Sequence, residues 1–278
     1  GQVASALLRS GLGKGDRVGI WAHNCYEWLL MQIATAKAGI VLVNINPAYR
    51  ATELEYALNL VGCRMLVTMT AFKTSDYLGM VRELAPELAS AAPGALGAAR
   101  VPQLRTVVHL GQEAVPGMGT FDELMAKGDP HDPALHTIAS TLRATDPINI
   151  QFTSGTTGFP KGATLTHRNI LNNGFFIGEA MNLSEHDRLC VPVPLYHCFG
   201  MVLGNLACLT HGACIVYPKD GFDALAVLQA VQAEKCTGLH GVPTMFIAEL
   251  AHPRFHEFDL SSLRYLSGGG AAMPQAVA

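Results

Sequence analysis

The hydrophobic and polar positions of this chain follow two periods in turn, and this alternation predicts an α/β fold. Short apolar runs bounded by turn residues predict strands, and apolar residues at every third or fourth position predict helices. In the first part of the chain we expect strands over residues 17–22, 40–45, 63–68, 104–110 and 148–152. Helices are expected between them over residues 26–38, 52–61 and 121–127. Strands that alternate with helices form a parallel sheet with covered faces.

The same alternation continues through the rest of the chain. Strands are expected over residues 163–166, 188–194, 213–217, 237–242 and 263–267, and helices over residues 167–181, 199–210, 222–235 and 244–250. Thr52, with Glu55 three residues later, predicts a capping box, whereas residues 131–145 read as polar chain without an element. The fold class is therefore α/β, with layered, parallel-rich sheets covered by helices.

The most informative stretch is residues 153–162, which read Thr-Ser-Gly-Thr-Thr-Gly-Phe-Pro-Lys-Gly. They directly follow the expected strand 148–152, in which Ile148, Ile150 and Phe152 alternate with polar residues as in a half-buried strand. Glycines let backbone N–H groups approach a ligand closely, hydroxyls add donors, and Lys161 supplies a positive charge. This combination predicts a loop that binds a polyphosphate.

The loop differs from the common P-loop, in which glycine directly precedes the lysine and a hydroxyl residue follows it. Here Phe159 and Pro160 separate Gly158 from Lys161, and Gly162 follows the lysine. Because Pro160 prevents the loop from continuing straight into a helix, we expect Lys161 on a mobile hairpin. The alternative is a flexible linker, and the buried-looking strand before the loop argues against it.

Two further strand ends carry candidate residues, because open α/β sheets bind ligands at the carboxyl ends of their strands. His197 lies just past an expected strand in apolar surroundings, where an imidazole can contact a carboxylate or line an acyl pocket. A purely structural histidine is the alternative, and both interpretations stay open. Residues 268–270 are three glycines after the last expected strand. They suit either the close approach of a purine or a tight turn.

Composition and charge narrow the class of protein. Among 278 residues, 49% are apolar and 15% charged, as in globular proteins, and the formal net charge of −3 argues against a general nucleic-acid binder. The longest nearly apolar run, residues 198–209, is too short to span a bilayer. Seven cysteines without C-x-x-C spacing predict buried thiols in a reducing compartment. No metal-binding spacing such as H-E-x-x-H occurs.

Taken together, these motifs resemble the adenylate-forming, or AMP-binding, superfamily, which includes acyl- and aryl-CoA synthetases, firefly luciferase and peptide-synthetase adenylation domains. Residues 153–162 match the signature loop of that family, and residues 36–47, 194–200 and 268–274 are similar to its other motifs in the same order. A narrower resemblance is to medium-chain acyl-CoA ligases, including the mitochondrial acyl-CoA synthetase family member 2 and bacterial fatty-acid–CoA ligases. It is carried by residues 46–50, 53–56, 146–152 and 194–198.

The resemblance implies a two-step reaction on a fatty acid, ATP with Mg²⁺, and coenzyme A. The carboxylate would form an acyl-adenylate and pyrophosphate, and the thiol of coenzyme A would then displace AMP. It implies catalytic roles for Lys161 and His197. It places the nucleotide beside Thr153, Ser154, Gly155, Thr156, Thr157, Gly158, Lys161, Gly269, Gly270 and Ala271. The compartment would be the cytoplasm for a bacterial protein or the mitochondrial matrix for a mitochondrial one.

The departure from the family pattern is at the end of the chain. The Tyr-Gly-x-Thr-Glu segment of the family, its hinge and its small C-terminal domain would follow Ala278. We therefore expect residues 1–278 to be an incomplete large N-terminal AMP-binding domain without the small domain, and to be inactive alone. The alternatives are an aryl-CoA ligase, a peptide-synthetase adenylation domain or a non-catalytic nucleotide-binding derivative. A Walker-type NTPase is the rival from another class, and the missing Gly-Lys-Ser/Thr counts against it.

Overall fold

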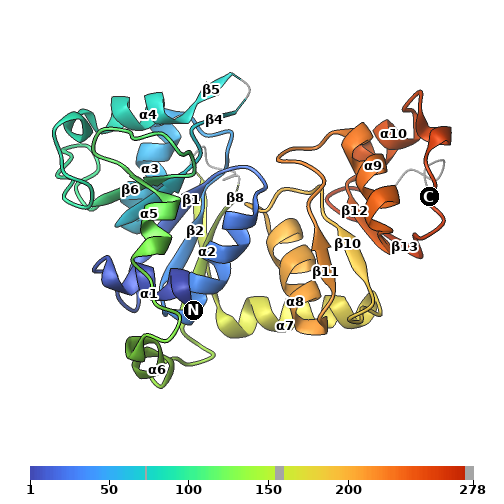
Figure 1. The fold of residues 1–278 in the computed structure, drawn as a ribbon, viewed down its shortest axis with the longest axis horizontal. Coiled ribbons are helices and arrows are strands. Elements are labelled where there is room, and N and C mark those ends of the chain that lie inside the picture. Colours follow the sequence, from blue (N-terminus) through green and yellow to red (C-terminus); the bar gives the residue numbers. More distant parts are fainter. Residues whose placement is uncertain (73, 154–159, 273–278) are drawn as a thin grey trace. The chain divides into compact units, whose positions relative to one another are not determined.

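The computed structural model describes residues 1–72, 74–153 and 160–272, and these form two compact units (Figure 1). The first unit comprises residues 1–22 and 27–167, and the second comprises residues 23–26 and 168–278. The four residues 23–26 are thus separated in sequence from the rest of the second unit. Each unit has its own sheet and its own hydrophobic core.

The first unit is built on a seven-stranded sheet in the order β7-β6-β3-β1-β2-β8-β9. The neighbouring strands are parallel except for β8 and β9, which pair antiparallel as a hairpin. The parallel-rich sheet expected from the sequence is therefore confirmed. The strands are β1 (Arg17–Trp21), β2 (Val41–Asn44), β3 (Met65–Thr68), β6 (Thr106–His109), β7 (Gly119–Thr120), β8 (Pro147–Thr153) and β9 (Lys161–Thr166).

Helices and connections cover this sheet and complete the core of the first unit. Trp21 and Tyr77 pack edge to face within that core, with ring centroids 4.4 Å apart. A short antiparallel pair, β4 (Ala71–Phe72) and β5 (Ser75–Asp76), precedes α4. The helices are α1 (Gln2–Arg9), α2 (Tyr26–Lys37), α3 (Ala51–Val61), α4 (Tyr77–Leu84), the 3-10 turn η1 (Pro86–Ala89), α5 (Phe121–Ala126) and α6 (Pro133–Ala139).

Two local expectations for the first unit are wrong. The capping box of α3 lies two residues earlier than expected, because the backbone N–H of Arg50 donates to Glu53 Oε2 at 3.1 Å. Glu55 instead pairs with Arg100. Residues 131–145 contain the helix α6, which begins at Pro133. The Asp132 carboxylate caps this helix by accepting a hydrogen bond from the Ala134 N–H. An aspartate followed by proline is a helix-start signal.

The strand β8 is buried on both faces rather than half-buried. Residues 148–151 are all buried, including the polar Asn149. Its Nδ2 donates to Asn44 Oδ1 at 3.0 Å and to Leu42 O at 3.1 Å. A buried amide whose N–H donors pair across neighbouring strands can occupy a core position, because the donors keep partners there. The polar residues of this strand therefore did not mark a solvent-facing side.

The second unit is built on a four-stranded parallel sheet in the order β11-β10-β12-β13. Its strands are β10 (Arg188–Cys190), β11 (Cys214–Val216), β12 (Gly238–Gly241) and β13 (Tyr265–Gly268). The strand expected over 188–194 ends at Cys190, and the helix expected over 199–210 is a π-helix followed by an α-helix. The helical segments are α7 (His167–Ala180), the π-helix η2 (Phe199–Leu206), α8 (Ala207–His211), α9 (Ala224–Glu234), α10 (Pro243–Leu250) and the 3-10 turn η3 (Phe255–Glu257).

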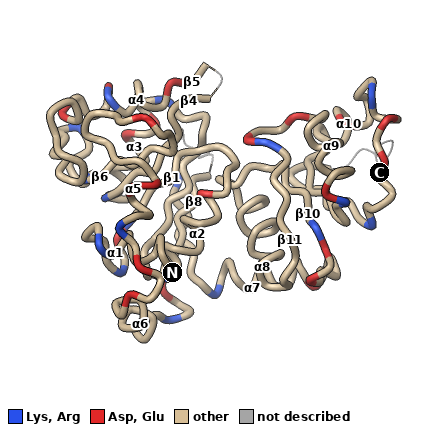
Figure 2. The backbone as a smooth tube through the Cα atoms, in the orientation of Figure 1, with Lys and Arg blue, Asp and Glu red and all other residues tan. Residues whose placement is uncertain are grey.

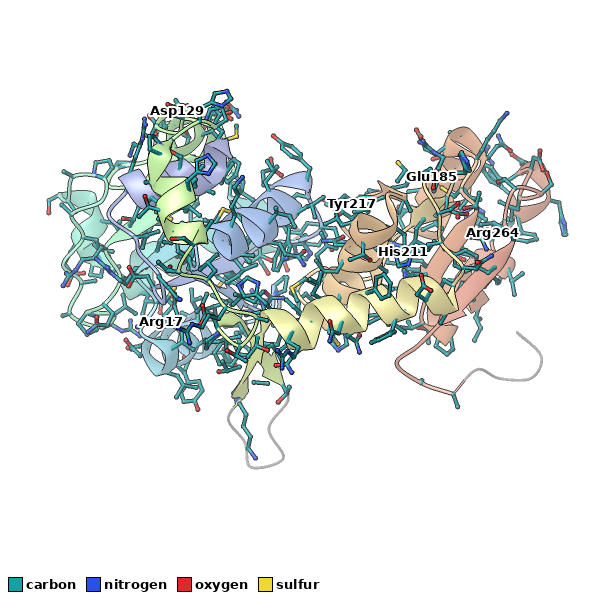
Figure 3. The ribbon with its side chains drawn as sticks, turned by 90° about the horizontal axis from the view of Figure 1, so that it is seen from below. Arg17, Asp129, Glu185, His211, Tyr217 and Arg264 are labelled. Atoms are coloured by element: carbon teal, nitrogen blue, oxygen red, sulfur yellow. The ribbon has the colours of Figure 1, made fainter. Side chains whose placement is uncertain are left out.

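A buried carboxylate ties together the starts of three strands in this sheet. Asp187 Oδ1 accepts from the Thr237 hydroxyl at 2.7 Å and from Arg264 Nε at 2.9 Å. Arg264, labelled in Figure 3, also donates to Asn182 O at 2.7 Å. Burial acts to raise the pKa of Asp187, and these hydrogen bonds outweigh it and hold the pKa below its usual value. The amino ends of the strands are thereby fixed, opposite the ends where ligands are expected.

Candidate functional site

The candidate phosphate loop leaves the carboxyl end of a buried strand and returns as an edge strand. Thr153, the last residue of β8, pairs with Lys161, the first residue of β9. The expected hairpin is confirmed, and Lys161 and Thr153 are both exposed on it. Ser154, Gly155, Thr156, Thr157 and Gly158 were predicted to contact the nucleotide, and they lie outside the described residues. Their roles stay predictions.

The backbone fixes the orientation of His197. The Phe199 N–H donates to His197 Nδ1 at 3.1 Å, and the His197 N–H donates to Pro194 O at 3.3 Å. The imidazole is exposed, and desolvation by its neighbours lowers its pKa from the ordinary value. A neutral ring that accepts at Nδ1 carries its proton on Nε2. His197 therefore presents an N–H donor, and it carries no positive charge at neutral pH.

Two candidate segments meet at the carboxyl ends of parallel strands in the second unit. His240 of β12 lies beside Ser267 of β13, and Gly241 lies beside Gly268. The Phe199 ring packs edge-on against the His240 ring, with centroids 4.9 Å apart. Phe199 begins η2, two residues after His197. Phe199 of the histidine motif and the glycine motif therefore lie at one end of the second sheet.

The structure gives two of the glycines a packing reason of their own. A Cβ added at Gly269 would lie 3.1 Å from Phe199 Cε1. Gly270 adopts φ +80°, a backbone conformation that residues with a Cβ rarely adopt. The tight-turn interpretation is thus supported by contacts. These contacts do not test the predicted adenine contacts of Gly269, Gly270 and Ala271, which stay predictions.

The sequence reasoning did not identify His240, which is buried at the carboxyl end of β12. Its Nε2 lies 3.2 Å from Leu203 O, a carbonyl of the π-helix. Burial lowers the pKa of His240 to about 4, so the ring is neutral at physiological pH. π-Helical turns are frequently found at functional sites. A polar residue interrupting the apolar run of β12 was the signal available in the sequence.

The cysteines act as small apolar side chains for the most part. All seven are free thiols, and Cys63, Cys190, Cys208 and Cys236 are buried. Cys198 is exposed, and its Sγ lies 3.7 Å from His197 Nδ1. Partial desolvation by neighbouring atoms raises the pKa of the exposed Cys198 thiol, so it is less readily ionised than a free cysteine.

Side chains of both signs occur in each unit. Figure 2 shows Lys and Arg interspersed with Asp and Glu along the backbone. Within the described ranges, no three or more His, Cys, Asp or Glu side chains are placed to hold a metal ion. No helix in the part of the chain that the structure describes is long and apolar enough to cross a membrane.

Comparison with protein families decides the class. The model of the AMP-binding enzyme family matches residues 1–278, the whole chain. The chain belongs to the AMP-binding enzyme family. Its resemblance to the adenylate-forming superfamily is therefore confirmed.

The similar members of the family are acyl-CoA ligases. The chain is 46% identical to the mitochondrial medium-chain acyl-CoA ligase ACSF2 of Danio rerio, over 99% of this chain and 46% of that protein. It is 48% identical to YngI of Bacillus subtilis strain 168, named as an acyl-CoA synthetase, over 99% of this chain and 50% of that protein. The chain therefore spans about half the length of the curated relatives it matches.

Solved structures of AMP-binding enzymes share the fold. The anthranilate CoA ligase AuaEII in complex with anthranoyl-AMP superposes with a TM-score of 0.85 at 26% identity, covering 99% of this chain and 49% of that one. The N-terminal domain of FACL13 from Mycobacterium tuberculosis superposes with a TM-score of 0.80 at 23% identity, covering 99% of this chain and 62% of that one. The layered α/β fold is thus that of the N-terminal part of adenylate-forming enzymes.

Proposed function

We propose that the protein carrying this chain activates a fatty acid of medium chain length by AMP-forming chemistry. A carboxylate oxygen attacks the α-phosphorus of ATP, the bond to pyrophosphate breaks, and an acyl-adenylate forms. The thiol of coenzyme A then loses its proton and attacks the acyl carbon, so that a thioester forms and AMP leaves. The observation that carries this proposal is the 46–48% identity, over nearly the whole chain, to relatives named as acyl-CoA ligases and synthetases.

Lys161 is proposed to neutralise charge on the β- and γ-phosphates. Its place at the start of β9, opposite Thr153, supports this role because the hairpin brings both ends of the signature loop to one point. Negative charge builds up on pyrophosphate as it leaves, and a fixed cation stabilises that charge in the transition state. Hydroxyl and backbone donors of residues 153–158 would complete the phosphate site.

His197 is proposed to orient the fatty-acid carboxylate. Its Nδ1 is held by the Phe199 N–H, so Nε2–H is the free donor of the ring. A neutral N–H donor can hold one carboxylate oxygen by a hydrogen bond and leave the carboxylate ionised, as it must be to act as a nucleophile. Gly269, Gly270 and Ala271 are proposed to lie beside adenine, where a bare backbone allows a planar ring to approach.

Mg²⁺ is proposed to enter bound to ATP, and it supplies neutralisation of the phosphate charge. The described residues offer no cluster of metal-binding side chains, so we assign none of them as its ligand. Residues 1–278 are proposed to be part of the large N-terminal domain. The proposed partners are small molecules only, with no nucleic acid. The proposed compartment is the bacterial cytoplasm or the mitochondrial matrix.

The test is product analysis with the full-length protein that carries these residues. ATP and coenzyme A are supplied with short-, medium- and long-chain fatty acids, and with benzoate and anthranilate as aryl acids. We expect AMP, pyrophosphate and acyl-CoA in equal amounts, with the highest kcat/KM for medium-chain acids. Formation of ADP would refute the adenylation mechanism. Turnover of the aryl acids alone would assign the protein to the aryl-CoA ligases, the substrate class of AuaEII.

A further inference from the structure

A four-residue segment that follows β1 lies with the second unit, and one of its side chains contacts the segment that precedes His197. Residues 23–26 belong to the second unit although both flanking segments belong to the first. We propose that Asn24 is a positioning residue that fixes the turn carrying His197. This inference rests on the proposed function, because it gives His197 the role of contacting the acid.

The Asn24 side chain makes one hydrogen bond to the residue before Pro194 and one to the residue after it; we call this pair of hydrogen bonds the bracket. Its Nδ2 donates to Val193 O at 3.0 Å, and its Oδ1 accepts from the Leu195 N–H at 2.9 Å. The Asn24 backbone N–H donates to Asp220 O at 3.0 Å, which anchors the bracket to the connection between β11 and α9. Both polar atoms of one side chain are therefore used on one short segment.

The bracketed segment has no strand ladder to hold it. The strand β10 ends at Cys190, and Pro194 has no N–H to donate. Val193 and Leu195 are fully buried, so without Asn24 the Val193 carbonyl and the Leu195 N–H would each lose a hydrogen-bond partner away from water. Leaving a buried polar group unpaired is destabilising. Asn24 therefore supplies what a neighbouring strand would supply elsewhere.

A backbone hydrogen bond couples the position of Pro194 to that of His197. The His197 N–H donates to Pro194 O, and the Met201 N–H donates to His197 O at 3.0 Å. Gly200 packs against the same carbonyl, because a Cβ there would lie 2.5 Å from Pro194 O. A shift of residues 193–195 would move the turn, and with it the imidazole. Displacement of a positioning group by about 1 Å can cost a hundredfold in rate.

The chemistry of the bracket requires an amide. Asparagine offers a donor and an acceptor on one short side chain, whereas ionised aspartate has the same shape and only acceptors. Asn24→Asp keeps the acceptor for the Leu195 N–H and replaces the donor to Val193 O with a repelling oxygen. The matched control is Asn59→Asp, since Asn59 Nδ2 also donates to a distant backbone carbonyl, Arg100 O at 2.8 Å, but lies in the first unit.

The experiment uses the full-length protein and measures KM for a fatty acid and KM for ATP separately. For Asn24→Asp we expect kcat/KM for the acid to fall by about tenfold or more, with KM for ATP within about twofold of the wild type. Asn59→Asp should leave both values unchanged. A purely structural asparagine would instead lower Tm and change both KM values together, or change neither, and either result would overturn the proposal.

A second measurement needs no variant and covers the case in which Asn24→Asp fails to fold. In the wild type, the amide of Leu195 should exchange its hydrogen as slowly as the amide of Val191, which donates to Val216 O at 2.9 Å. Exchange at the rate of an exposed loop amide would show that the bracket does not hold and would overturn the proposal. If the wild type forms no acyl-adenylate, the proposed function fails, while hydrogen exchange still tests the bracket.

Discussion

The Phe199 ring packs against the His240 ring and against the backbone of Gly269. The Phe199 and His240 rings meet at 65°, and Phe199 Cε1 is the atom nearest to the place where a Gly269 Cβ would lie. Segments far apart in the sequence thus define one packed corner at the end of the second sheet. Two contacts define this corner: the edge-to-face packing of the two rings, and the close approach of Phe199 to Gly269, which has no side chain.

Filling the space at Gly269 should disturb this corner. Gly269→Ala places a methyl group 3.1 Å from the buried Phe199 ring, so the ring has to move against His240. We expect a loss of about 1–3 kcal/mol in the free energy of unfolding, as for other overpacked sites, measured by urea denaturation. Gly97→Ala is the control, because a Cβ there meets no atom within 4 Å. Equal stability of the two variants would contradict the packing argument.

Removing the Lys161 ammonium should affect chemistry far more than folding. Lys161 is exposed at the start of an edge strand, so Lys161→Ala should leave Tm nearly unchanged. In the full-length protein, adenylation should slow by about a hundredfold, because removal of one group that stabilises transition-state charge typically costs this much. Pyrophosphate exchange measures the rate, and Lys37→Ala, at another exposed lysine, serves as the control. Unfolding of Lys161→Ala would show instead that the lysine is structural.

Glu249 should make the stability of the chain fall as pH rises. Its carboxyl is buried among apolar side chains beside a cavity of about 130 Å³, and burial raises its pKa to about 8. Since the unfolded value is near 4.5, the folded chain holds a proton that the unfolded chain has lost. The stabilising effect of that proton is complete below pH 4.5 and disappears as pH rises to 8, at up to about 1.4 kcal/mol per unit.

The variant Glu249→Gln removes this titration and keeps the shape of the side chain. It should unfold at a higher urea concentration than the wild type at pH 8, and the difference should shrink toward pH 4.5. Glu257→Gln, at an exposed carboxyl in the same unit, should show a much smaller change. A difference between Glu249→Gln and the wild type that stays constant over this range would disprove the raised pKa.

The buried amide pair between β2 and β8 should contribute to the stability of the first unit. Asn149→Ala removes the donor to Asn44 Oδ1 and to Leu42 O, both in the interior. We expect a loss of about 1–3 kcal/mol in the free energy of unfolding, because buried acceptors lose their partner. The exposed Asn59→Ala is the control and should cost less. Equal losses would show that the pair across the strands contributes nothing beyond an exposed hydrogen bond.

Sequence periodicity by itself determined most of the α/β order, the parallel-rich sheets and the hairpin at Lys161. These features follow from local rules, because apolar spacing and turn residues act over a few positions. The signature loop was identified for the same reason, since its glycines, hydroxyls and lysine are consecutive. The cap of α3 was placed two residues too late because Thr52 with Glu55 fits the capping-box pattern and Arg50 does not. The start of α6 was missed because Asp132 and Pro133 lie in a polar stretch.

Only the tertiary structure decided which distant residues serve one site. Asn24 forms hydrogen bonds with Val193 and Leu195, which lie 169 and 171 positions away in the sequence. His240 meets Phe199 because β12 lies beside β10 in the second sheet, an order that periodicity does not encode. Local patterns specify elements, whereas the pairing of strands is settled by burial and hydrogen bonding between segments far apart in the chain. The loop could therefore be found in the sequence, and the residues that support the histidine could not.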